Sequence, residues 1–145
     1  MTTVLVTGFG AFGTTLINPA KLVAQALDGA SLGSTKIIAR VVPCTFFKCI
    51  DFVQAAITEV QPNLVIMLGE YGGRSLITVE RLAQNLNDSA RYQLADSDGL
   101  VLQDTPTVPG GPVAYYTTVP IRAMVTPAPG RHPGRYLRYP GYESL

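Results

Sequence analysis

The first 68 residues alternate short apolar runs with amphipathic segments, and this alternation limits the fold more than any other feature of the sequence. Apolar runs at Val4–Thr7, Ile37–Val42 and Leu64–Leu68 are typical of buried parallel strands. Apolar residues at helical spacing predict helices over 19–28 and 46–60. The order strand, helix, strand, helix, strand predicts an α/β fold with a mostly parallel, doubly wound sheet.

Local signals mark the ends of both predicted helices. Asn18 and Pro19 predict the N-cap and first turn of the first helix, and Gly29 predicts its end. Thr45 is expected to cap the second helix, which ends before Pro62. The apolar stripe expected to face the sheet from the first helix comprises Leu22, Val23, Ala26 and Leu27.

Glycine-rich sequences follow the first and third predicted strands, at 8–13 (GFGAFG) and 69–74 (GEYGGR). Ligands of doubly wound sheets bind at the carboxyl ends of the strands, so function is expected there. The first sequence contains G-x-G-x-x-G, but no helix opens directly beneath it and the second strand carries Arg40 instead of a ribose-binding acid. Dinucleotide binding, a purely structural loop and a substrate loop all remain open. Phe9 and Phe12 favour a substrate loop for a flat, small, neutral ring.

The second half of the sequence is less regular. Residues 76–87 begin with β-prone residues and 92–112 are polar and contain glycine, which predicts strands or hairpins joined by long loops. Residues 120–124 predict the start of a helix that does not continue. From Val125 the composition becomes rich in Pro, Gly, Arg and Tyr without periodicity. We therefore expect an α/β domain over 1–124 and an irregular tail over 125–145.

Composition excludes several classes of function. The net charge is +1, which gives no electrostatic basis for binding nucleic acid or an anionic membrane. No apolar run is long enough to span a bilayer, so we expect a cytoplasmic protein. Two cysteines, Cys44 and Cys49, are too few for a disulfide framework and are expected to be reduced.

Residues 1 to about 124 resemble pyroglutamyl peptidase I, the pyrrolidone-carboxylate peptidase family of cysteine exopeptidases. The resemblance lies in VLVTGFGAFG with Asn18-Pro19, GGR at 72–74, ITVERLAQNLN at 77–87 and GGPVAYYTTVPIRAM at 110–124. It implies a three-layer α/β/α sandwich and removal of an N-terminal pyroglutamyl residue from peptides. It also implies a Cys-His-Glu triad that needs neither a metal nor a cofactor.

The resemblance also assigns roles to individual residues. Phe9 and Phe12 match the aromatic residues that hold the pyroglutamyl ring, Glu80 matches the triad carboxylate, and Arg91 matches an arginine near the site. In acyl transfer the carboxylate fixes the tautomer of the imidazole and stabilises its charged form. Without the resemblance, Glu80 would be interpreted as a surface or strand-edge residue paired with Arg81, and Arg91 as a surface group.

The nucleophile and histidine of the family lie downstream of the matched residues. Cys44 and Cys49 occupy other positions, and the single histidine, His132, lies in the tail. Codons can be chosen for Pro129–Leu145 such that the same nucleotides, read one position later, encode a stretch similar to the next part of the family. We therefore expect a frameshifted and truncated pyroglutamyl peptidase, incomplete at its C-terminus and catalytically inactive.

Three alternatives remain open at this point. The first is a working peptidase in which Cys44 or Cys49 substitutes as nucleophile. The second is a Rossmann-like nucleotide-binding domain, and the third is a non-catalytic pyroglutamate-binding or assembly protein. Assembly into a homo-oligomer is compatible with each of them.

Overall fold

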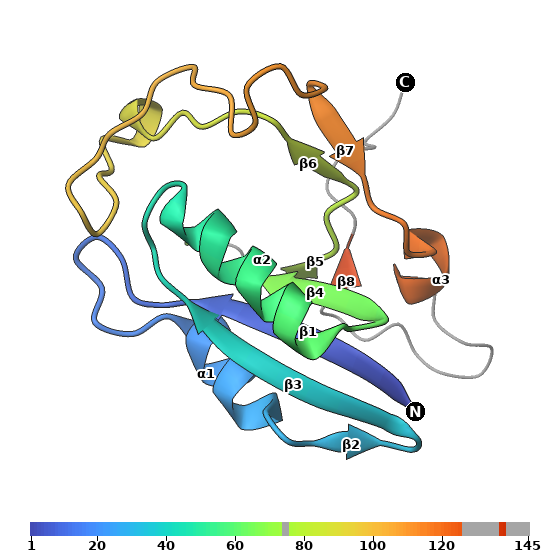
Figure 1. The fold of residues 1–145 in the computed structure, drawn as a ribbon. Helices are drawn as coiled ribbons and strands as arrows, with labels where there is room; N and C mark the ends of the chain where they lie inside the picture. Colours follow the sequence, from blue (N-terminus) through green and yellow to red (C-terminus); the bar gives the residue numbers. More distant parts are fainter. Residues whose placement is uncertain (74–75, 126–136, 139–145) are drawn as a thin grey trace. The chain divides into compact units, whose positions relative to one another are not determined.

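The computed structural model describes residues 1–73, 76–125 and 137–138, which fall into two compact units (Figure 1). The first unit comprises Met1–Glu70 and Asp88–Asp104. The second unit comprises Tyr71–Asn87 and Thr105–Leu145. The predicted boundary at 124/125 stays a prediction, because much of the tail lies outside the described residues.

A four-stranded sheet forms the centre of the first unit. Its strands are β1 (Thr2–Phe9), β2 (Ser31–Leu32), β3 (Thr35–Val42) and β4 (Leu64–Leu68), in the order β2-β3-β1-β4. β3, β1 and β4 are parallel, which confirms the three predicted strands, whereas the short antiparallel β2 was not predicted. Gly8 pairs in register with Val41 and with Leu68. The glycine-rich sequences after β1 and β4 therefore leave the same edge of the sheet.

Helices α1 (Pro19–Leu27) and α2 (Lys48–Val60) cover opposite faces of this sheet (Figure 1). Neighbouring residues of a strand point to opposite faces. In β3, Ala39 packs in a cluster with Ala24 of α1, while Arg40 forms an ion pair with Glu59 of α2 at 2.7 Å. The arrangement is a three-layer α/β/α fold, as expected.

The face that α1 buries differs in part from the predicted one, of which Leu27 does pack against the core cluster. Ala20 and Ala24 are buried, whereas Leu22 and Val23 are about half exposed. The reason is the close approach of α1 to β1, since a Cβ atom added to Gly8 would lie 2.1 Å from the carbonyl oxygen of Ala20. Only small side chains fit between a helix and a strand at this separation.

Both ends of α1 are as predicted. The Asn18 Oδ1 accepts a hydrogen bond from the Ala20 N–H at 2.9 Å, so Asn18 is the N-cap. Beyond the helix, Gly29 has a φ of +76°, which glycine adopts without steric cost.

The predicted cap of α2 is wrong. The helix begins at Lys48 after Phe47, whose φ is 63°, and no side chain caps it. The hydroxyl of Thr45 is buried and has no hydrogen-bond partner among the described residues, although its carbonyl oxygen accepts the Cys49 N–H at 3.1 Å. The start of α2 is held by a carboxylate from another part of the chain instead of a local cap.

The second unit contains short strands and one short helix. β6 (Leu82–Gln84) pairs antiparallel with β7 (Ala114–Tyr116), and β5 (Ile77–Thr78) pairs parallel with β8 (Leu137–Arg138). α3 (Ile121–Val125) is the brief helix predicted near residue 120. β8 is a regular element within the tail expected to be irregular; residues 126–136 and 139–145 lie outside the described part.

Two kinds of feature are absent from the described residues. No helix among them is long and apolar enough to cross a membrane. They also contain no group of three or more His, Cys, Asp or Glu side chains placed to hold a metal ion.

Candidate functional site

The glycine loop, residues 8–13, begins at the end of β1 and carries both aromatic residues expected to bind substrate. Phe9 and Phe12 are half-buried. The loop is fixed to the end of β3 because the Gly10 N–H donates to the Val42 carbonyl oxygen at 2.9 Å. Gly13 has a φ of +60°, which turns the chain away from the sheet. Two aromatic side chains are thus presented from a fixed backbone at the carboxyl edge.

Asn18 connects this loop to α1. Its side chain is buried, with Oδ1 accepting the Ala20 N–H and Nδ2 donating to the Gly10 carbonyl oxygen at 2.9 Å. A dinucleotide would need free N–H groups at the helix N-terminus. Here Asn18 occupies one of them and Pro19 has no N–H. The nucleotide-binding alternative is therefore not favoured.

The loop after β4 contributes a residue that the sequence analysis did not single out. Glu70 directly follows Gly69, and its Oε2 atom is buried without a hydrogen-bond partner among the described residues. Nothing in the sequence distinguishes it, since an isolated glutamate after a strand carries no pattern. Gly73 in the same loop has a φ of +84°, so a turn requires glycine there.

Glu80, the expected triad carboxylate, belongs to the second unit, between β5 and β6. It is exposed, and its Oε1 accepts a hydrogen bond from the Thr78 hydroxyl at 3.3 Å. Phe9, Phe12 and Arg91 belong to the first unit, so these three share one body and Glu80 lies in the other.

Arg91 lies in a short 3₁₀ helix, η1 (Ala90–Tyr92), within the part of the first unit formed by 88–104. Its N–H donates to Asp88 Oδ1 at 3.4 Å, and its guanidinium carbon lies 5.6 Å from the centre of the Tyr92 ring. The residue is exposed.

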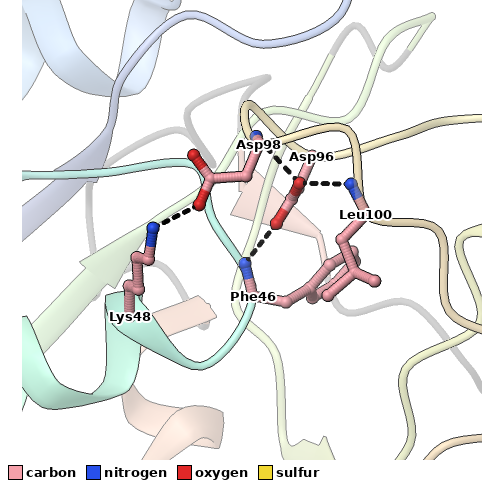
Figure 2. A network of polar contacts seen from close by, with 5 residues as sticks. All are labelled: Phe46, Lys48, Asp96, Asp98 and Leu100. Carbon is pink, nitrogen blue, oxygen red and sulfur yellow. Dashed lines mark hydrogen bonds and ion pairs between the residues drawn. The ribbon is translucent and has the colours of Figure 1, made fainter.

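Asp96, in the same segment, accepts hydrogen bonds from three backbone N–H groups. Figure 2 shows its carboxylate accepting backbone N–H groups on both oxygens: Phe46 at 2.8 Å on Oδ2, and Asp98 at 2.9 Å and Leu100 at 2.8 Å on Oδ1. Burial acts to raise the pKa of Asp96, but these donors together bring the pKa below its usual value. The sequence signal was the run Asp-Ser-Asp-Gly, which is typical of a turn but does not reveal the distant partner.

The two cysteines are free thiols on either side of the start of α2. Burial raises the pKa of Cys44, and the neighbouring Cys49 and Asp96 raise it further. Burial also raises the pKa of Cys49, although backbone N–H groups partly oppose the shift. A thiol in such surroundings is a poor nucleophile because the thiolate is the reactive form. His132 lies outside the described residues.

Comparison with known sequences identifies relatives over most of the chain. The sequence profile of the pyroglutamyl peptidase family matches residues 2–131. The pyrrolidone-carboxylate peptidase of Mycobacterium tuberculosis is 61% identical over 125 residues, which are 86% of this chain and 56% of that protein. That of Escherichia fergusonii is 42% identical over 126 residues, or 87% of this chain and 58% of that protein. The chain thus spans a little over half the length of these curated relatives.

Solved structures give the same result. Bacillus amyloliquefaciens pyroglutamyl peptidase I matches with a TM-score of 0.81 and 36% identity, covering 86% of this chain and 59% of that chain. A mutant pyrrolidone carboxyl peptidase from the hyperthermophile Pyrococcus furiosus matches with a TM-score of 0.80 and 38% identity, covering 85% and 58%. The profile, the sequence relatives and the fold agree over most of the chain. This chain belongs to the pyroglutamyl peptidase family.

Proposed function

We propose that this chain recognises the N-terminal pyroglutamyl residue of a peptide and that the glycine loop carries the recognition. The observation that supports this most is the family match over residues 2–131, which include the loop. The pyroglutamyl ring is a small, flat, uncharged lactam, and the half-buried rings of Phe9 and Phe12 suit its faces. The proposed partner is therefore a peptide with a blocked N-terminus.

For Glu80 and Arg91, which belong to different units, we propose the separate roles that the family match suggests. Glu80 is assigned the carboxylate role of a Cys-His-Glu triad, in which it orients an imidazole through a hydrogen bond. The Thr78 hydroxyl that donates to Glu80 supports this role, because it restrains one carboxylate oxygen. Arg91 is proposed as a polar group at the rim of the site.

We infer that the 145-residue chain itself does not turn over pyroglutamyl substrates. Acyl transfer by a cysteine peptidase requires a thiolate beside an imidazole. The chain has only Cys44 and Cys49, and burial raises the pKa of both thiols. The two free thiols are compatible with the reducing cytoplasm, which is the location we propose.

Recognition is tested by calorimetric titration of the chain with L-pyroglutamamide, using L-prolinamide, which lacks the lactam carbonyl, as the control ligand. Phe12→Ala should weaken binding by about tenfold, the loss expected from one aromatic contact. Leu16→Ala is the matched variant, since Leu16 is 94% exposed and lies just beyond the same loop. Equal affinity for both ligands would contradict the proposal.

Turnover is tested with a fluorogenic pyroglutamyl amide. The chain should release no fluorophore above a control without protein. Release that disappears in Cys44→Ser or Cys49→Ser would show that one of these thiols serves as nucleophile and that the inactivity proposed here is wrong.

A further inference from the structure

The segment 88–104 is the part of the first unit that returns from the second unit, and it carries Arg91. Hydrogen bonds join the beginning of this segment to its end. The Ala90 N–H donates to the Leu102 carbonyl oxygen at 2.9 Å, and the Leu102 N–H donates to Ser89 Oγ at 3.0 Å. Arg91 and the residues after it therefore move with this closed segment and not as a free loop.

Three polar contacts tie the segment to residues 44–48, which lead from β3 into the first residue of α2. Figure 2 shows two of them, between Phe46 and Asp96 and between Lys48 and Asp98. The Phe46 N–H donates to Asp96 Oδ2 at 2.8 Å, and the Ser97 N–H donates to the Cys44 carbonyl oxygen at 2.9 Å. Lys48 and Asp98 also form an ion pair, but both side chains are exposed and such pairs contribute little. The contacts of Asp96 and Ser97 are therefore the principal polar ties.

The same segment also borders the glycine loop. The nearest atom to a Cβ built on Gly13 is the Leu94 Cδ2, at 3.8 Å. Leu94 lies two residues before Asp96 and three after Arg91. A shift of the segment at Asp96 would thus move Leu94 relative to the loop that carries Phe12.

We propose that Asp96 is a positioning residue for the pyroglutamyl site: by holding the segment 88–104, which carries Arg91, against residues 44–46, it places Leu94 beside the glycine loop. The inference rests on the proposed function, because it assumes that the loop binds the pyroglutamyl ring. Asp96 acts through the segment and contacts no substrate. The two oxygens have separate tasks, since Oδ1 shapes the turn and Oδ2 reaches Phe46.

This division of tasks makes Asp96→Asn an informative variant. An amide side chain keeps one acceptor oxygen, which can still close the turn, but its NH₂ group then faces the Phe46 N–H and cannot accept from it. We expect amide hydrogen exchange at Phe46 to become about tenfold faster as this tie opens. Exchange in the buried strand β1 should be unchanged, which would show that the fold is intact. Affinity for L-pyroglutamamide should fall about fivefold or more, since the segment loses its fixed place.

Asp104→Asn is the matched control. It makes the same charge change in the same segment, and Asp104 already has a φ of 46°, which asparagine tolerates. Exchange at Phe46 and ligand affinity should both match those of the unmodified chain. If Asp96→Asn speeds amide exchange throughout β1, the variant has lost its fold, and Ser97→Pro replaces it as the test of the attachment. Ser97→Pro removes the N–H that donates to the Cys44 carbonyl oxygen but keeps the Asp96 carboxylate.

The outcomes separate the two claims. If the unmodified chain binds L-pyroglutamamide and Asp96→Asn speeds exchange at Phe46 without weakening binding, the positioning role is wrong. Unchanged exchange at Phe46 in Asp96→Asn would overturn it as well. If the unmodified chain does not bind the ligand, the proposed function fails, and exchange at Phe46 and Leu94 alone then decides whether Asp96 holds the segment.

Discussion

Gly8 illustrates how a single position sets the spacing between a helix and a strand. A Cβ atom there would lie 2.1 Å from the Ala20 carbonyl oxygen and 3.0 Å from the Ala24 Cβ. The Ala20 carbonyl belongs to the backbone and cannot move aside by side-chain rotation. Any side chain at residue 8 would therefore push α1 away from β1. The first glycine of the G-x-G-x-x-G pattern is therefore required by packing.

Gly8→Ala should lower the free energy of unfolding by about 3 kcal/mol, the upper end of the usual cost of overpacking a core. Gly69→Ala is the control, because Gly69 directly follows β4 at the same edge of the sheet, and among the described residues only its chain neighbours could lie within 4 Å of an added Cβ. It should change the stability by less than about 1 kcal/mol. Urea denaturation measures both, and equal stability of the two variants would contradict the packing argument.

The thiols lead to a second prediction at the residue scale. Since the pKa of both Cys44 and Cys49 is raised by burial, the thiolate fraction near neutral pH is lower than in a free thiol. Alkylation by iodoacetamide should therefore be slower than that of free cysteine, and its rate should still rise above about pH 8.5, the ordinary pKa of a thiol. A cysteine that reacts quickly at pH 7 would argue for a hidden nucleophile. Mass spectrometry of the alkylated chain gives both rates.

At the scale of elements, periodicity and local caps predicted what is local. The three strands, the Asn18 cap and the brief helix near residue 120 are confirmed. The start of α2 was missed because its decisive acceptor, Asp96, lies 50 residues beyond Phe46. The burial of Ala20 and Ala24 in α1 was not predicted either. It depends on how closely Gly8 lets the helix approach β1, which the hydrophobicity of the sequence does not show.

The tie between Asp96 and α2 predicts a pH dependence. Because the pKa of Asp96 is lowered in the folded chain, its stabilising effect is fully present above the ordinary aspartate pKa of about 3.9. This stabilising effect is lost as the pH falls through the pKa that Asp96 has in the folded chain. The stability difference between the unmodified chain and Asp96→Asn should therefore be largest near neutral pH and shrink below about pH 4. Urea midpoints measured from pH 7 to pH 2.5 test this, and a constant difference would contradict it.

At the scale of the whole molecule, the family and the fold follow from the sequence, whereas the site is only partly placed. Glycines, aromatic residues and Asn18-Pro19 occur together in one short stretch, so their arrangement at the carboxyl edge was predictable. Glu80 and Phe12 belong to different units, and their joint role stays a prediction. No local pattern fixes how two such units combine, because that depends on contacts between distant residues.

The edge of the sheet predicts self-association. Among the described strands, β4 is the last of the four-stranded sheet, and its adjacent residues Ile66 and Met67 are 39% and 62% exposed on opposite faces. An apolar edge strand without charge or proline favours pairing with another chain. Sedimentation velocity should show an average mass that rises with concentration, and Met67→Lys should reduce this rise. A monomer at every concentration would contradict the prediction.

The central claim is that the glycine loop of this family member recognises the pyroglutamyl ring. The most direct measurement is an NMR titration of the ¹⁵N-labelled chain with L-pyroglutamamide. The account predicts saturable shift changes centred on the amides of residues 8–13 and at Arg91, with none for L-prolinamide at the same concentrations. Shift changes that are absent, equal for both ligands, or confined to residues outside the loop would contradict it.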